Sequence, residues 1–434
     1  MPTHLAKLLY NLVLLPLLRI VVRVKARKDS RIREGLERRH GVWERLGTAL
    51  GERDWQKPLL WFHVASAGEL LQAQPVISRC AAEEWQCVLT YSSVNALRWV
   101  ERMGGVPDVL AADFLPEDTM FHARRLLGLI QPSGIVHVSY DLWPNLIWEA
   151  QRQGIPQGLI SALVHAGSAR EAKWHGRAFY RSLYEALEFA GAVAETDRSR
   201  ILRSAPQHPE VFVMGDTRCD SVLERRDRLS PPEFPEVVAG KFLLVAGSIW
   251  PPDEECITPG LKSALFTNPD LFVIAAPHEP TESHLKSVES AFAEFQPLRW
   301  SQREGADAQT RMLVVDQVGL LAGLYRGADL AYVGGAFTTG VHNTLEPAAM
   351  GLPVIFGPRH DNSHEALSMI ERGLAFTVQT PESFTTVLKD LLSNRKRCQE
   401  LGTQVREFVE AQAGASEQAT RRIRQWLPET PAES

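Results

Sequence analysis

Short apolar runs alternate with longer amphipathic stretches along most of this chain, starting after Lys57-Pro58. Apolar runs of this length suit strands buried on both faces, and the amphipathic stretches suit crossover helices between parallel strands. The first series of expected strands is Leu59–Val64, Cys87–Tyr91, Val109–Phe114, Gly134–Tyr140, Gly158–Leu163, Gly191–Glu195 and Val211–Gly215, with helices such as Glu117–Ile130 and Pro144–Gln153.

A proline-rich segment, residues 229–236, separates this series from a second one, because its prolines favour extended backbone over helix. The second series of expected strands is Phe242–Ala246, Leu271–Ala275, Met312–Asp316, Leu330–Gly334 and Pro353–Phe356, followed by helix from Pro381 to about Trp426. The pattern predicts an α/β protein with a first Rossmann-like domain over 48–228, a linker over 229–236 and a second Rossmann-like domain over 237–427. Such sheets bind ligands at the carboxyl ends of their strands, so we expect the two domains to face a ligand-binding cleft.

The first 47 residues form a separate basic segment. They hold eleven Lys and Arg against four Asp and Glu, whereas the whole chain of 434 residues has a net charge of −5. The apolar run over 8–22 is shorter than the roughly 20 residues of a membrane span, and Asn11, Pro16 and Arg19 interrupt it. An apolar run followed by basic residues favours an anchor on an anionic membrane surface. A helix packed on the protein's own surface, or a short true span, are the alternatives.

Composition and charge exclude several classes of partner and site. The acidic net charge makes nucleic acid an unexpected partner. The five cysteines are scattered and the chain has no HExxH spacing, so we expect neither a disulfide framework nor a protein-bound metal.

Two candidate carboxylates follow expected strands of the first half. Glu69 ends the segment Ser66-Ala67-Gly68-Glu69, where small residues and the start of a helix favour an anion, and it could accept a proton from a hydroxyl. Its alternative role is that of a first-turn acid that complements the helix dipole. Asp141 follows the strand that ends at Tyr140, and its alternative role is to cap the next helix.

Small and polar residues follow the strands of the second half. They are Ser248 in a Gly-Ser turn, Pro277 and His278, the pair Gly334 and Gly335, and then Asn343, Thr344, Leu345 and Glu346. A Gly-Gly turn allows close backbone approach by a nucleotide, and a helix opened by Asn343 and Thr344 could hold a phosphate. Glu346 could then accept hydrogen bonds from ribose hydroxyls, whereas a capped helix in a tight loop is the alternative interpretation.

The order of these motifs resembles the 3-deoxy-D-manno-octulosonic acid (Kdo) transferases of lipopolysaccharide synthesis. The resemblance is carried by Glu44-Arg45-Leu46-Gly47, Ser66-Ala67-Gly68-Glu69, Asp141-Leu142-Trp143-Pro144-Asn145, Gly215 through Asp220, Ala246-Gly247-Ser248, Pro277-His278, Asp316 through Leu321, and Val333 through Pro347. The chain departs from the family where many members read ETELWPN, PRHPER and NPLE, which marks a divergent branch.

The resemblance implies a GT-B glycosyltransferase fold and an inverting transfer of Kdo from CMP-Kdo to a lipid A precursor, lipid IVA, at the cytoplasmic face of the inner membrane. It implies that Glu69 is the general base. From its place at the carboxyl end of a strand, Asp141 is expected to be a second catalytic carboxylate, with the helix-capping role as the alternative. The implied CMP contacts are Pro277, His278, Gly319, Leu320, Leu321, Asn343, Thr344, Leu345 and Glu346, and no cofactor besides the donor is implied. Two alternatives stay open: a GT-B enzyme with another nucleotide-sugar donor, and a membrane-bound nucleotide-sugar binder without catalysis.

Overall fold

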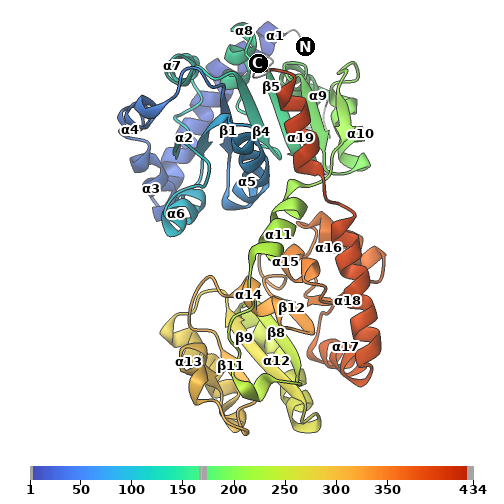
Figure 1. Ribbon diagram of the computed structural model, residues 1–434. Coiled ribbons are helices and arrows are strands. Elements are labelled where there is room, and N and C mark those ends of the chain that lie inside the picture. The colour runs from blue at the N-terminus through green and yellow to red at the C-terminus, as the bar shows by residue number, and fades with distance from the viewer. Residues whose placement is uncertain (1–2, 166–167, 169–173, 428–434) are drawn as a thin grey trace, which may run out of the picture. The chain divides into compact units, whose positions relative to one another are not determined.

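Two seven-stranded parallel sheets organise the chain in a computed structural model that describes residues 3–165, 168 and 174–427 (Figure 1). Contacts divide the chain into two compact units. The first unit runs to Ser221 and resumes at Gln412, and the second unit is Val222–Ala411.

The first unit holds a sheet of strand order β3-β2-β1-β4-β5-β6-β7. Its strands are β1 (Leu59–Val64), β2 (Gln86–Tyr91), β3 (Ala111–Phe114), β4 (Gly134–Val138), β5 (Gln157–Ala162), β6 (Phe189–Ala192) and β7 (Val211–Val213). Its main helices are α5 (Ala67–Ala82), α6 (Val94–Met103), α7 (Met120–Ile130), α8 (Pro144–Arg152), α9 (Trp174–Tyr184), α10 (Glu195–Ser204) and α11 (Thr217–Arg228), which runs on into the second unit. All six residues of β1 are buried, as an apolar run between two helical layers requires.

The second unit holds a sheet of strand order β10-β11-β9-β8-β12-β13-β14. Its strands are β8 (Phe242–Ile249), β9 (Leu271–Pro277), β10 (Leu298–Arg299), β11 (Met312–Val314), β12 (Leu330–Val333), β13 (Val354–Phe356) and β14 (Ala375–Thr377). Its helices are α12 (Pro251–Thr267), α13 (Glu282–Ala291), α14 (Leu321–Arg326), α15 (Leu345–Ala349), α16 (His364–Glu371), α17 (Pro381–Ser393) and α18 (Arg395–Glu410). The predicted strands are all present, and the sequence pattern missed β10 and β14 because two or three residues are too few to show a period.

The last helix returns to the first unit. Residues up to 427 were expected in the second domain, yet α19 (Ala415–Arg424) packs against α5 and β5 of the first unit. Asp220 accepts hydrogen bonds from the backbone N–H groups of Gly414 and Ser416, both at 2.7 Å, and so fixes the start of this helix. Trp426 then stacks on Phe189 with ring centres 5.4 Å apart.

The basic segment is helical and lies on the first unit. It contains α1 (Thr3–Leu9), a π-helical turn over Tyr10–Leu14, α2 (Leu15–Ala26), α3 (Ser30–Arg38) and α4 (Val42–Ala49). The π turn ends two residues before Pro16, whose missing N–H and ring disturb the regular α-helical hydrogen bonds. The helix is continuous over His4–Ala26, 23 residues, and is long and apolar enough to cross a membrane. The apolar run over 8–22 predicted a segment too short for that. The helix is longer than this run because Asn11, Pro16 and Arg19 do not end it.

Polar side chains bind this N-terminal helix to the unit along its length. The hydroxyl of Tyr10 donates to Asp118 at 2.8 Å, and the amides of Asn11 and Asn145 hydrogen-bond to each other at 2.9 Å. Further along the helix, Arg19 makes a two-armed ion pair with Glu117. The other faces expose apolar side chains such as Leu17 and Ile20, which are 54% and 58% exposed.

Candidate functional site

Glu69 lies at the carboxyl end of β1, in the first turn of α5. Ser66 is the N-cap of that helix, and its hydroxyl accepts the N–H of Glu69 at 3.4 Å. In return, Oε2 of Glu69 accepts the N–H groups of Ser66, at 3.2 Å, and of Ala65. This reciprocal capping box holds a carboxylate that is only 3% exposed in a defined orientation. Glu69 therefore caps the helix, and a catalytic role would be a second function of the same side chain.

Asp141 is held by a residue of the neighbouring strand β1 and by the N-cap residue of α8. Its Oδ2 is 2.9 Å from Nε2 of His63, on β1, and accepts the indole N–H of Trp143 at 2.9 Å. Nδ1 of His63 is in turn 2.8 Å from the hydroxyl of Thr90, on β2. Burial raises the pKa of Asp141, but the hydrogen bonds from His63 and Trp143 outweigh it and hold that pKa below its ordinary value. Asp141 is therefore a charged group at neutral pH.

These groups meet at the point where the strand order of the sheet reverses. The chain places β2 and β3 on one side of β1 and β4 to β7 on the other, and His63 and Asp141 bridge β1 and β4. Ligands of open parallel sheets bind at this kind of position. The sequence indicated Glu69 and Asp141 but missed His63 as a partner, because the residues are 78 positions apart.

The candidate residues of the second unit follow four adjacent strands, in the order β11, β9, β8 and β12. Gly319, Leu320 and Leu321 follow β11, Pro277 and His278 end and follow β9, Ser248 is near the end of β8, and Gly334 and Gly335 follow β12. The parallel sheet thus brings together at one edge what the sequence scatters over about a hundred residues.

The Gly334-Gly335 turn is held by the protein's own hydrogen bonds. The N–H of Gly334 donates to the carbonyl of Gly247, and the N–H of Gly335 donates to the Asp253 carboxylate, both at 2.9 Å. A Cβ on Gly334 would lie 2.3 Å from the carbonyl oxygen of Ser248, so only glycine fits. The turn allows close approach to the sheet edge, as expected, but these two N–H groups already have acceptors.

Three aromatic rings gather beside this turn, those of Trp250, His278 and His342. The ring of His278 stacks on both Trp250, with ring centres 4.6 Å apart, and His342, with ring centres 4.3 Å apart. The indole N–H of Trp250 donates to Nε2 of His342 at 2.9 Å, which leaves the proton of a neutral His342 on Nδ1. Burial and the neighbouring His278 lower the pKa of His342 to about 4, so His342 is a neutral hydrogen-bond donor at physiological pH.

The segment over 343–346 is more constrained than expected. Asn343 accepts the N–H of Leu345 at 3.1 Å, and the helix that follows, α15, has only five residues. Burial raises the pKa of Glu346, while an ion pair with Arg225, at 2.7 Å, partly offsets this. The hydroxyl of Thr344 is buried and has no hydrogen-bond partner in the part of the chain that the structure describes. The Thr344 hydroxyl thus has unused hydrogen-bonding capacity, and the residue is fully buried.

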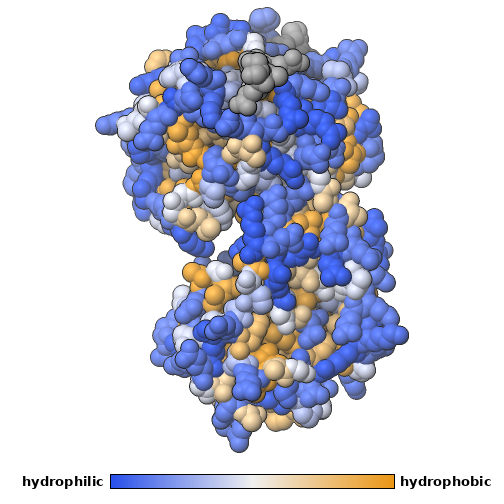
Figure 2. Space-filling model, viewed as in Figure 1, coloured by the Kyte–Doolittle hydropathy of each residue, from blue (hydrophilic) through white to orange (hydrophobic). Residues whose placement is uncertain are grey.

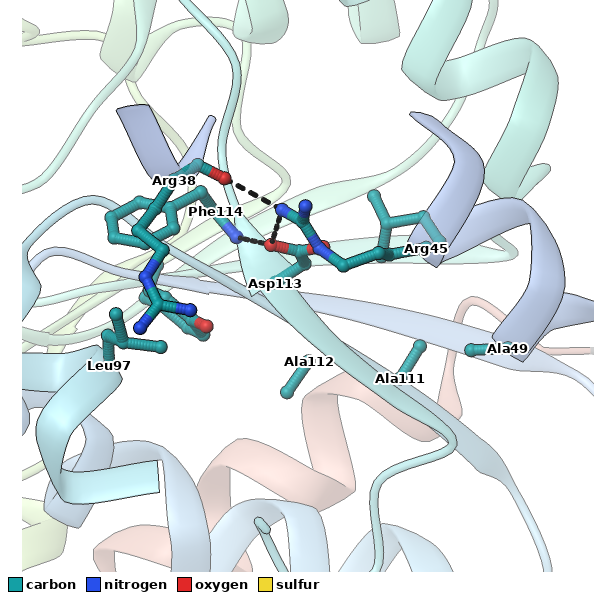
Figure 3. A pocket seen from close by; sticks show the side chains of 10 residues that line it. Arg38, Arg45, Ala49, Leu97, Ala111, Ala112, Asp113 and Phe114 are labelled. Carbon is teal, nitrogen blue, oxygen red and sulfur yellow. Dashed lines mark hydrogen bonds and ion pairs between the residues drawn. The ribbon is translucent and has the colours of Figure 1, made fainter. Parts of the chain in front are cut away.

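Other motif residues have structural roles. Arg45 makes two hydrogen bonds to the carboxylate of Asp113, at 2.7 and 2.8 Å, and donates to the backbone carbonyl of Arg38 (Figure 3). They line a small cavity of about 270 Å³. Arg45 therefore ties the basic segment to β3. Across the described ranges, no group of three or more His, Cys, Asp or Glu side chains is placed to hold a metal ion.

Comparison with known proteins identifies the class. The family described as 3-deoxy-D-manno-octulosonic-acid transferase (kdotransferase) matches residues 40–221. A 3-deoxy-D-manno-octulosonic acid transferase of Chlamydophila psittaci is 31% identical over 72% of this chain and 73% of its own length. One of Haemophilus influenzae is 23% identical over 93% of this chain and 94% of its own length.

Solved structures agree on the fold. MurG of Acinetobacter baumannii superimposes with a TM-score of 0.55 at 14% identity, over 85% of this chain and 99% of that one. A UDP-GlcNAc 2-epimerase of Neisseria meningitidis bound to UDP-GlcNAc gives 0.59 at 14% identity, over 85% and 99%. The fold is thus GT-B-like, with two Rossmann-like sheets. The chain belongs to the Kdo transferase family.

Proposed function

We propose that this Kdo transferase moves Kdo from CMP-Kdo to a lipid A precursor with inversion at the anomeric carbon. The observation that carries the proposal is the capping-box carboxylate at the carboxyl end of β1, in a chain that belongs to this family. A hydroxyl of the acceptor attacks the anomeric carbon, the bond to the CMP phosphate breaks, and Glu69 takes the hydroxyl proton.

Asp141 is proposed as the second carboxylate of the acceptor site. Its hydrogen bonds to His63 and Trp143 keep it charged, so it is suited to accept hydrogen bonds from sugar hydroxyls rather than to donate a proton. Glu69 and Asp141 then have different tasks, set by their surroundings.

The edge of the second sheet is proposed to bind the CMP part of the donor. Two groups are suited to the oxygens of a nucleotide: the Thr344 hydroxyl, which has no other partner in the described chain, and the Nδ1–H of His342. The exposed ring of His278 is suited to stacking on the base. Gly334 and Gly335 let the nucleotide approach the backbone closely, while their own N–H groups already have acceptors within the protein. The other proposed contacts are Ser248, Pro277, Gly319, Leu320, Leu321, Asn343, Leu345 and Glu346.

The N-terminal helix is proposed to lie in the cytoplasmic surface of the inner membrane. Tyr10, Asn11 and Arg19 are bonded to the folded unit at points spread along the helix, and a perpendicular span would have to break these bonds. The exposed apolar side chains and the basic residues that follow supply the two terms of interfacial binding to an anionic surface. The lipid acceptor resides in the same surface.

The test is a transfer assay with full-length protein, CMP-Kdo generated in situ and a tetra-acylated lipid A precursor in mixed micelles. We expect a Kdo-lipid product, and inhibition by CMP well below the concentrations at which UDP or GDP inhibits. Inhibition by UDP or GDP instead would support another nucleotide-sugar donor. CMP binding with no product from any acceptor would support a non-catalytic binder.

A further inference from the structure

An apolar groove lies between α2 and the body of the first unit. Its volume is about 590 Å³, within the range of small-molecule binding sites. Leu15, Leu18 and Val22 line one wall from α2, and Val42, Trp43 and Pro116 line the opposite side. Positions 15, 18 and 22 share one face of an α-helix, so a whole stripe of α2 faces the groove.

The groove is continuous with the exposed apolar side of the same helix. Leu17, next to Leu18, points elsewhere and is 54% exposed, while Leu18 itself is 50% exposed at the edge of the groove. Figure 2 shows an apolar area on the side of the unit where Figure 1 labels α2. The groove lining also holds Glu117 and Asp118, which bond to Arg19 and Tyr10, and Arg23 adds a positive charge one helical turn beyond Arg19. An apolar chain attached to an anionic headgroup matches this combination.

The other wall of the groove leads to the candidate acceptor site. Trp143 lines the groove and donates its indole N–H to Asp141 at 2.9 Å. One ring therefore contacts both the apolar groove and the carboxylate at the reversal point of the sheet. A bulk membrane lipid would not use this link between the groove and Asp141. A lipid whose headgroup reacts at this sheet edge would occupy both.

We propose that this groove binds an acyl chain of the lipid acceptor, which rests on the proposed transfer to a lipid. The groove holds the chain out of the bilayer while the headgroup reaches the carboxyl ends of β1 and β4. It selects acceptors by their acyl chains, independently of the contacts made by the donor.

The experiment compares Leu18→Trp with Leu17→Trp in full-length protein. Both changes add the same apolar bulk to the same helix, but only Leu18→Trp fills the groove. We expect Leu18→Trp to raise the KM for the tetra-acylated precursor about tenfold and to leave the KM for CMP-Kdo and binding to phosphatidylglycerol vesicles unchanged. With the same disaccharide lacking acyl chains, Leu18→Trp and wild type are expected to react equally. The proposal is overturned if both variants raise the KM alike, or if Leu18→Trp is equally impaired on the chainless acceptor.

A second measurement does not depend on catalysis. A lipid A precursor with a photoreactive diazirine in one acyl chain is irradiated with the protein, and adducts are mapped by mass spectrometry. We expect adducts on the groove walls around Val42 and Trp43 that unlabelled precursor abolishes and excess phosphatidylglycerol does not. Adducts competed equally by phosphatidylglycerol, or confined to Leu17 and Ile20, would overturn the proposal. If adducts form as expected but no transfer occurs, the groove assignment stands and the proposed reaction fails.

Discussion

Replacing Glu69 by Gln separates the two roles that one side chain has at the start of α5. The Gln amide oxygen can still accept the N–H groups of Ala65 and Ser66, and Gln is a normal capping-box residue, so the helix keeps its cap. The side chain loses the ability to take a proton. We therefore expect the free energy of unfolding to change by less than about 1 kcal/mol. Transfer is expected to slow by about 10²–10⁴-fold, the usual value of a positioned general base.

Ser66→Ala is the matched control. It removes the hydroxyl that accepts the Glu69 N–H and so weakens the cap by about 1 kcal/mol, but it leaves the carboxylate in place. Initial rates of Kdo transfer and urea unfolding curves should be measured for wild type and both variants at a temperature where all are folded. We expect stability to fall in Ser66→Ala and activity to fall in Glu69→Gln. The reasoning is refuted if Glu69→Gln keeps more than a tenth of wild-type transfer, or if Ser66→Ala loses as much activity as Glu69→Gln.

Three further predictions concern other parts of the chain. Arg45→Met leaves the buried carboxylate of Asp113 without its two charged hydrogen bonds, so urea unfolding should show a loss of about 2–3 kcal/mol; an unchanged midpoint would contradict the assigned role. Gly334→Ala forces a Cβ to within 2.3 Å of the Ser248 carbonyl, so calorimetry should show CMP binding at least tenfold weaker, and unchanged binding would place the nucleotide elsewhere. Burial lowers the pKa of His137 to about 4. As the pH falls from 7 to 4, this histidine takes up a proton in the unfolded chain before it does so in the folded protein, so stability should fall by about 3 kcal/mol. His137→Gln should remove that part of the pH dependence, and an identical slope in the variant would show that other groups cause it.

Much of the fold could be predicted because its signals are local. A strand buried on both faces needs a continuous apolar run, and Leu59–Val64 was predicted with the bounds that β1 has in the structure. Candidate residues were found because parallel strands all end at one edge, so a polar residue directly after a strand lies at that edge. This rule brought out Glu69, Asp141 and His278 without any knowledge of strand order.

The partners of these residues could not be predicted in the same way. Asp141 pairs with His63, which lies inside the buried strand β1, 78 positions away in the sequence. Glu346, expected to meet ribose, forms an ion pair with Arg225, 121 positions away. Hydrogen bonds depend on distance in space, and sequence separation of this size carries no information about it.

The sequence by itself determined the two α/β series, the basic apolar N-terminal segment and the motifs of the family, since each depends on the identity and spacing of neighbouring residues. Only the tertiary structure decided that the last helix returns to the first unit, that the amides of the Gly334-Gly335 turn are already bonded, and that the N-terminal helix lies along the protein. The physical reason is the same in each case. These features are fixed by contacts such as those of Asp220, Asp253 and Asp118, short-range polar interactions that form only after the apolar core has brought distant segments together.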